Sequence, residues 1–144
     1  SPGAPLEGGP TGPAMIQPYL PEIETEGELS LIYLGGAFSH AIRKRPRPGD
    51  FRVQPEYESV ITAHAPAADE LAAAEAVLDR VEEELLYARV DLVRSLDGSA
   101  VLMELELVEP DLYLEQDPAG GAAFVDAILG ATRKAARKAP SRHD

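Results

Sequence analysis

The sequence predicts an α+β protein: an antiparallel β-sheet with two main helices packed on one face. Three observations indicate this class. Short apolar stretches of strand length recur along the chain, two longer stretches carry apolar residues at three- and four-residue steps, and glycine-containing turns join neighbouring strands. Strands joined by such tight turns pair antiparallel, because a parallel pair needs a long crossover connection.

The first residues differ in composition from those that follow. Residues 1–14 are rich in proline and glycine, and we expect a flexible lead there. The stretch MIQPYL at 15–20 predicts a short strand, and Pro18 and Pro21 place it at a sheet edge or in a connecting segment. The folded domain is expected over residues 15–138.

Three strands are predicted in the first half of the domain. ELSLIYL at 28–34 and AFSHAIRKR at 37–45 have strand composition, and the pair Gly35-Gly36 between them is typical of a two-residue hairpin turn. A third strand, ESVITA, is expected at 58–63, after a proline- and glycine-bearing stretch.

A helix and a second hairpin follow. Residues 66–85 predict a helix whose apolar stripe covers the sheet, formed by Leu71, Ala74, Leu78, Val81 and Leu85. Strands are expected at 86–95 and 100–107, joined through Asp97-Gly98, a strong hairpin dipeptide.

The last predicted element is a helix at 121–138. Its inward-facing residues are expected to be Phe124, Val125, Ile128 and Leu129. Its basic end fits the preference of cations for a helix C-terminus, and residues 139–144 form a short basic tail.

Composition excludes several classes of protein. A chain of 144 residues with 44% hydrophobic residues fits one compact domain, and its net charge of -12 makes nucleic acid an unsuitable partner. There is no apolar run long enough to span a membrane, and no signal-peptide pattern. The absence of cysteine excludes disulfides and thiolate chemistry, and we expect a cytoplasmic protein with no membrane partner.

Two glutamates share one face of the last predicted strand. Alternation puts Glu104 and Glu106 together, and a two-residue turn at Asp97-Gly98 would set Asp91 opposite Glu104 and Arg89 opposite Glu106. The other face, toward the helices, would carry Val90, Leu92, Met103 and Leu105. A solvated surface explains the carboxylates simply, whereas an oxygen-only site for Mg²⁺ or Mn²⁺ explains why like charges face each other.

A basic cluster lies earlier in the chain. Residues 43–52 hold five of the thirteen lysines and arginines. Such a cluster can hold phosphate oxygens, or it can be a charged edge strand that discourages aggregation. Together with the carboxylates, it has the composition that a metal–nucleotide site requires.

Four stretches in order also resemble a known family. MIQPYLPEIETEGELSLIYLGG, HAIRKRPRPGDFR, YARVDLV and LMELELVEP are similar to the C-terminal half of the ATP-grasp ligases, particularly the branch of glutathione synthetase and bacterial ATP-grasp carboxylate-amine ligases. The resemblance covers residues 14–132. It implies an α+β subdomain that forms one wall of a nucleotide site, preceded by a hinge strand.

The resemblance also implies roles for individual residues near the nucleotide base and sugar. The hinge backbone that holds adenine matches Gln17, Pro18, Tyr19 and Leu20, and an acidic position near the ribose matches Glu28.

Other matched positions concern phosphate and metal. Lys44 or Arg45, together with Arg52, matches the basic positions that face the phosphates and the acyl-phosphate. The metal ligands implied are Asp91, Glu104 and Glu106. The family usually has asparagine at the last of these positions, so Glu106 is a departure that adds charge.

The implied activity is ATP-dependent ligation of a carboxylate to an amine through an acyl-phosphate, with ATP and Mg²⁺ or Mn²⁺ as cofactors. The resemblance does not extend to the family's earlier subdomain, so we expect a fragment or natural remnant that is inactive by itself. A non-catalytic ATP-grasp-like module that binds a partner or dimerises is the alternative, and a plain acidic interaction domain is a third reading.

Overall fold

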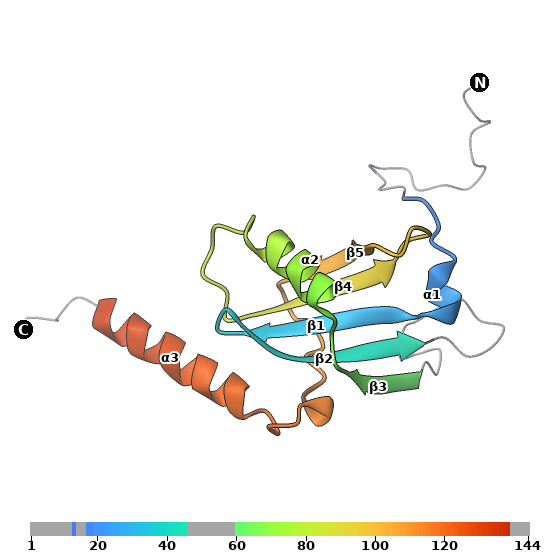
Figure 1. Ribbon diagram of the computed structural model, residues 1–144. Helices are drawn as coiled ribbons and strands as arrows, with labels where there is room; N and C mark the ends of the chain where they lie inside the picture. Colours follow the sequence, from blue (N-terminus) through green and yellow to red (C-terminus); the bar gives the residue numbers. More distant parts are fainter. Residues whose placement is uncertain (1–12, 14–16, 46–59, 139–144) are drawn as a thin grey trace, which may run out of the picture.

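The computed structural model describes residue 13, residues 17–45 and residues 60–138. Most of the predicted lead, residues 46–59, which include the later part of the basic cluster, and the tail lie outside these residues. The described part has a five-stranded antiparallel sheet in the order β3-β2-β1-β4-β5, which confirms the α+β class (Figure 1). The strands are β1 Glu28–Leu34, β2 Ala37–Arg45, β3 Val60–His64, β4 Tyr87–Arg94 and β5 Ala100–Glu106. The helices are α1 Glu22–Thr25, α2 Ala68–Leu78, a short 3-10 helix at Leu114–Gln116, and α3 Ala122–Lys138.

The central strand β1 is buried along its whole length, because both faces of the sheet are covered. On one face, Leu29 and Leu31 belong to a core cluster with Ala74 of α2. On the other, Ile32 packs in a cluster with Phe124 of α3. The prediction that both main helices lie on one face is therefore wrong.

α2 differs from the prediction in its length, and α3 differs in the face that it turns inward. α2 ends at Leu78 rather than 85, and the three consecutive glutamates at 82–84 explain this, since acidic residues oppose the negative end of a helix dipole. α3 packs through Phe124 and then extends away from the sheet (Figure 1), so the predicted inward positions Val125, Ile128 and Leu129 are exposed. No helix among the described residues is long and apolar enough to cross a membrane.

The first hairpin is confirmed. Leu34 pairs with Ala37 across the predicted turn, and Gly35 and Gly36 have φ values of 60° and 84°. Positive φ at both central residues defines the turn type that matches strand twist in two-residue hairpins.

The second hairpin reaches the predicted pairing by a different route. The amide of Ser95 bonds to the carbonyl of Ser99 at 2.9 Å, so the loop has three residues and the register near it is shifted by one. An irregularity opposite Asp91 and Leu92 restores the predicted register, and Asp91 pairs with Glu104. The extra residue is Met103, which contacts Gln17 and does not join the core cluster under α2, contrary to the prediction.

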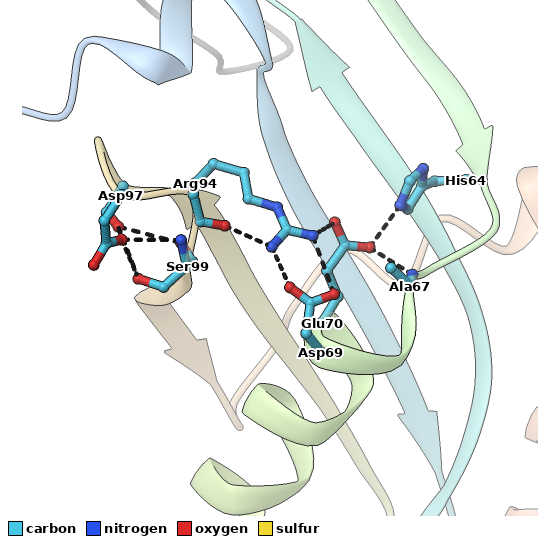
Figure 2. A network of polar contacts seen from close by, with 9 residues as sticks. His64, Ala67, Asp69, Glu70, Arg94, Asp97 and Ser99 are labelled. Carbon is cyan, nitrogen blue, oxygen red and sulfur yellow. Dashed lines mark hydrogen bonds and ion pairs between the residues drawn. The ribbon is translucent and has the colours of Figure 1, made fainter.

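A buried carboxylate ties α2 to the sheet (Figure 2). Glu70 is 2% exposed and accepts hydrogen bonds from the Ala67 amide at 2.8 Å and from Arg94 at 2.7 Å, while His64 Nε2 lies 2.9 Å away. Burial alone would raise the pKa of Glu70, but these hydrogen bonds outweigh burial and hold the pKa below its usual value. The network joins the ends of β3, α2 and β4.

We expect Glu70→Gln to destabilise the fold by about 2 kcal/mol at neutral pH, because the charged form makes the strong hydrogen bonds. Since the folded-state pKa is lowered, this contribution is complete above the unfolded-state pKa, near 4.3, and is lost as pH falls through the folded value. Urea melts at pH 7 and pH 3 test this. The difference in the free energy of unfolding between wild type and Glu70→Gln should be smaller at pH 3 than at pH 7. Glu75→Gln, an exposed change in the same helix, is the control. A difference of equal size at both pH values would contradict the prediction.

Candidate functional site

Three carboxylates meet on the face of the sheet opposite α2. Asp91 of β4 pairs with Glu104 of β5, and oxygens of Asp91, Glu104 and Glu106 all lie within 4.8 Å of one another. Asp91 is 1% exposed, Glu106 is half-buried and Glu104 is exposed, so the group runs from the core to solvent. The sequence prediction that these side chains share one face is confirmed.

Strand alternation separates the two candidate phosphate-binding residues of β2. Lys44 is buried and forms ion pairs with Glu28 and with Asp91, whose Oδ2 lies 3.5 Å from Nζ. Arg45 is exposed, and alternation directs it to the other face. Lys44 is therefore the residue that the fold brings to the carboxylates, and Arg52 lies outside the described residues.

A second buried cation, Arg89, was given no role by the sequence reasoning. Its Nε lies 3.0 Å from Asp91 Oδ1 and its terminal nitrogen 2.9 Å from Asp91 Oδ2, and the same nitrogen bonds to Glu106. Two signals could have identified it. Arg89 lies two residues before Asp91, hence on the same face of one strand, and it pairs with Glu106 in the predicted register.

Burial and charge act against each other at this site. Burial raises the pKa of Glu28 although Lys44 opposes it, and burial also raises the pKa of Glu106 against the pull of Arg89. Burial alone would lower the pKa of Lys44 and Arg89, but the adjacent carboxylates outweigh it and raise both pKa values.

The charge of the cluster fits a divalent cation. The carboxylates of Glu28 and the three-residue group outnumber Lys44 and Arg89 by two, and one divalent cation would balance this excess. The donors are all carboxylate oxygens, which suits Mg²⁺ or Mn²⁺ better than zinc or copper. The hydroxyl of Ser30, directly opposite Asp91 on β1, is buried and has no hydrogen-bond partner among the described residues.

An aromatic ring closes the cluster on the side of the segment after β5. Tyr113 is 7% exposed, and its ring centre lies 6.0 Å from Lys44 Nζ and 5.8 Å from Arg89 Cζ. Its backbone is left-handed, with φ of 48°, and its amide donates to Asp111 Oδ1 at 2.9 Å. Glu109 in the same segment is exposed.

Two pockets flank this cluster. Gln17, Pro18, Tyr19 and Leu20 line one of about 220 Å³ with Ile23 and with Met103, the residue before Glu104. These residues form no strand, so the strand prediction is wrong over the described residues 17–20, where Pro18 removes a backbone donor and Pro21 follows directly. A pocket of about 520 Å³ lies beside Tyr113, between Ile61 and residues 110–116.

Glycine is required where β1 enters the site. Gly27 has φ of 80°, and a Cβ there would overlap the carbonyl oxygen of Lys44 and lie 2.8 Å from Arg45 Cγ. Gly36 has φ of 84° but no atom within 4 Å of such a Cβ.

We therefore expect Gly27→Ala to destabilise the protein by more than Gly36→Ala. Both substitutions pay for left-handed backbone, roughly 1–2 kcal/mol, and only Gly27→Ala adds a backbone clash. Thermal or urea unfolding of the two variants measures the difference, and equal losses would show that β2 moves aside freely.

The sheet and its covering helices define the class: the chain has the fold of the ATP-grasp ligases, as the sequence resemblance implied. No family model matches the chain. Over 124 residues it is 36% identical to the cycloserine biosynthesis protein DcsG of Streptomyces lavendulae, a match that covers 79% of this chain and 40% of DcsG. The chain is homologous to DcsG over this region.

Solved structures agree with this assignment. The crystal structure of D-cycloserine synthetase DcsG matches with a TM-score of 0.65 and 32% identity, over 80% of this chain and 41% of that one. D-alanine–D-alanine ligase from Bacillus anthracis in complex with ATP matches with a TM-score of 0.53 and 18% identity, over 77% of this chain and 39% of the ligase. The chain thus spans about 40% of the length of the relatives it matches.

Proposed function

We propose that this chain is the metal- and nucleotide-binding half of an ATP-dependent carboxylate-amine ligase. The observation that carries the proposal is the meeting of Asp91, Glu104 and Glu106 within 4.8 Å, beside two buried cations. Homology to DcsG and the fold of an ATP-binding ligase support it.

In this proposal, Asp91, Glu104 and Glu106 hold Mg²⁺ or Mn²⁺. The metal, when bound, would neutralise the charge of ATP phosphates and of the transferring phosphoryl group. Lys44 and Arg89 supply further positive charge at fixed positions, Lys44 as a point charge and Arg89 through a planar fork that matches phosphate oxygens.

Other residues of the site position the reactants. Gln17, Pro18, Tyr19 and Leu20 hold the base through their pocket beside β5. Glu28, buried against Lys44, orients that ammonium; its contact with ribose, implied by the resemblance, stays a prediction. The pocket beside Tyr113 is the proposed place for the carboxylate or amine substrate.

The proposed reaction has two steps. A carboxylate oxygen attacks the γ-phosphorus of ATP and ADP leaves, and then the amine nitrogen attacks the acyl carbon and phosphate leaves. Positioning and charge neutralisation supply most of the acceleration in such transfers, so no protein nucleophile is required. We propose that the 144-residue chain binds metal and nucleotide weakly and turns over no ATP by itself.

NMR titration of the chain tests the binding. Mg²⁺ with ATP should shift the amide signals of residues 17, 19, 20 and 104–106, whereas ATP with chelator, or Mg²⁺ with AMP, should shift them much less. Shifts that are equal with and without metal, or that map away from these residues, would refute the proposed site.

A further inference from the structure

Arg89 already neutralises the oxygens that a divalent cation would need. Its guanidinium contacts both oxygens of Asp91, at 3.0 and 2.9 Å, and also bonds to Glu106. A carboxylate oxygen that accepts a charged hydrogen bond has less negative charge available for a metal, and a cation at this distance repels another cation.

The position of Arg89 is held from several sides. The side chain is 7% exposed, the Tyr113 ring lies 5.8 Å from Cζ, and a terminal nitrogen donates to the Asp111 carbonyl at 3.4 Å. This burial keeps the charge of the guanidinium strong within the cluster, whereas solvent would screen a surface arginine.

The two carboxylate contacts of Arg89 differ in exposure. Asp91 is 1% exposed, whereas the side chain of Glu106 is 27% exposed and stands beside the exposed Glu104. The contact with Glu106 is therefore the one that can be exchanged at the solvent edge. At the buried end, the hydroxyl of Ser30, which has no hydrogen-bond partner in the described part of the chain, lies opposite Asp91 and can replace a hydrogen bond that Arg89 gives up.

We propose that Arg89 is an internal counterion that competes with the divalent cation for Glu106 and one oxygen of Asp91, so that metal binds tightly only with a nucleotide. ATP phosphates offer the guanidinium a pair of charged oxygens that it can bind bidentately, as it binds a carboxylate. When they draw Arg89 from Glu106, the freed oxygens turn to the metal. This inference rests on the proposed function and adds to it an order: the metal enters as the metal–nucleotide complex.

Mn²⁺ binding, followed by electron paramagnetic resonance without nucleotide, tests the competition in the 144-residue chain. Arg89→Gln should bind Mn²⁺ at least tenfold more tightly than wild type. Arg94→Gln is the matched control, because Arg94 lies on the same strand but pairs with Asp69 and Glu70, outside the site, and should leave Mn²⁺ affinity unchanged. ATP should raise Mn²⁺ affinity more in wild type than in Arg89→Gln.

Two results would overturn the inference in distinguishable ways. If Arg89→Gln binds Mn²⁺ no better than wild type while Glu104→Gln loses binding, the metal site stands and the counterion role is wrong. If wild type and every variant fail to bind Mn²⁺ with or without ATP, the proposed function falls too. Should Arg89→Gln fold poorly, Arg89→Lys is the second variant. It keeps the charge but lacks the planar fork that holds both oxygens of Asp91, so its gain in Mn²⁺ affinity should be smaller than that of Arg89→Gln. The gain should also appear as a larger Mn²⁺-induced rise in Tm than in wild type.

Discussion

Replacing Lys44 by glutamine is expected to destabilise the folded chain by about 3–5 kcal/mol, because it leaves a buried carboxylate without its cation. Lys44 pairs with Glu28 and Asp91, and all three side chains are at most 10% exposed. Asp91 keeps Arg89 after the substitution, whereas Glu28 has no second cation among its described ion pairs. Glu28 would therefore have to be buried with its charge uncompensated or take up a proton.

Urea unfolding of wild type, Lys44→Gln and Arg45→Gln measures this effect. Arg45 is the neighbouring cation on the opposite, exposed side of the strand, so its substitution should change the free energy of unfolding by no more than about 0.5 kcal/mol. The double variant Lys44→Gln/Glu28→Gln should recover much of the loss, since it removes both charges. Equal effects for Lys44→Gln and Arg45→Gln would mean that solvent screens the cluster.

Glu104→Gln is expected to weaken the binding of the metal–nucleotide complex about a hundredfold, or about 2.7 kcal/mol, and yet to stabilise the metal-free protein. Glu104 faces Asp91 across the strands and has no ion-pair partner among the described residues. Removing like-charge repulsion between opposite residues should add about 0.2–1 kcal/mol to the free energy of unfolding.

Paired thermal melts, with chelator and with Mg²⁺ plus ATP, separate the two effects. At a tenfold excess of ligand over its Kd, wild type should gain about 1.4 kcal/mol, and Glu104→Gln should gain almost nothing. Glu82→Gln, an exposed change after α2, is the control and should respond like wild type. If Mg²⁺ plus ATP stabilises Glu104→Gln as much as wild type, the Glu104 carboxylate is a solvated surface group and not a ligand.

The pairing of the carboxylates was predictable, but partly for the wrong reason. The Asp97-Gly98 dipeptide predicted a two-residue turn, and the protein has a three-residue loop whose shift is cancelled by the extra residue Met103. A bulge has no reliable local signature, because it depends on how the strand packs against its neighbours. Here the extra residue contacts Gln17, which precedes the sheet in the chain.

Alternation alone shows that Lys44 and Arg45 lie on opposite faces of β2, but not which of them faces the carboxylates. Lys44 pairs with Glu28, and Asp91 pairs with Ser30, two residues further along β1 and therefore on the same face. Once the strand order is known, these pairings put Lys44 on the carboxylate face. The strand order itself comes from tertiary pairing of β1 with β4, residues far apart in the chain. The role of Arg89 depends on the same pairing.

By itself, the sequence determined the five strands of the sheet, the glycine hairpin and the alternation that gathers Glu104 and Glu106 on one face, because these follow from local backbone preferences and a two-residue period. Only the tertiary structure decided which face each helix covers. The consecutive apolar residues at 31–34 of this strand are compatible with cover on both sides, but the partner on each side is set by long-range packing. Tertiary structure also decided that Lys44 and Arg89 are buried among the carboxylates, since burial of a charge depends on the partners that surround it.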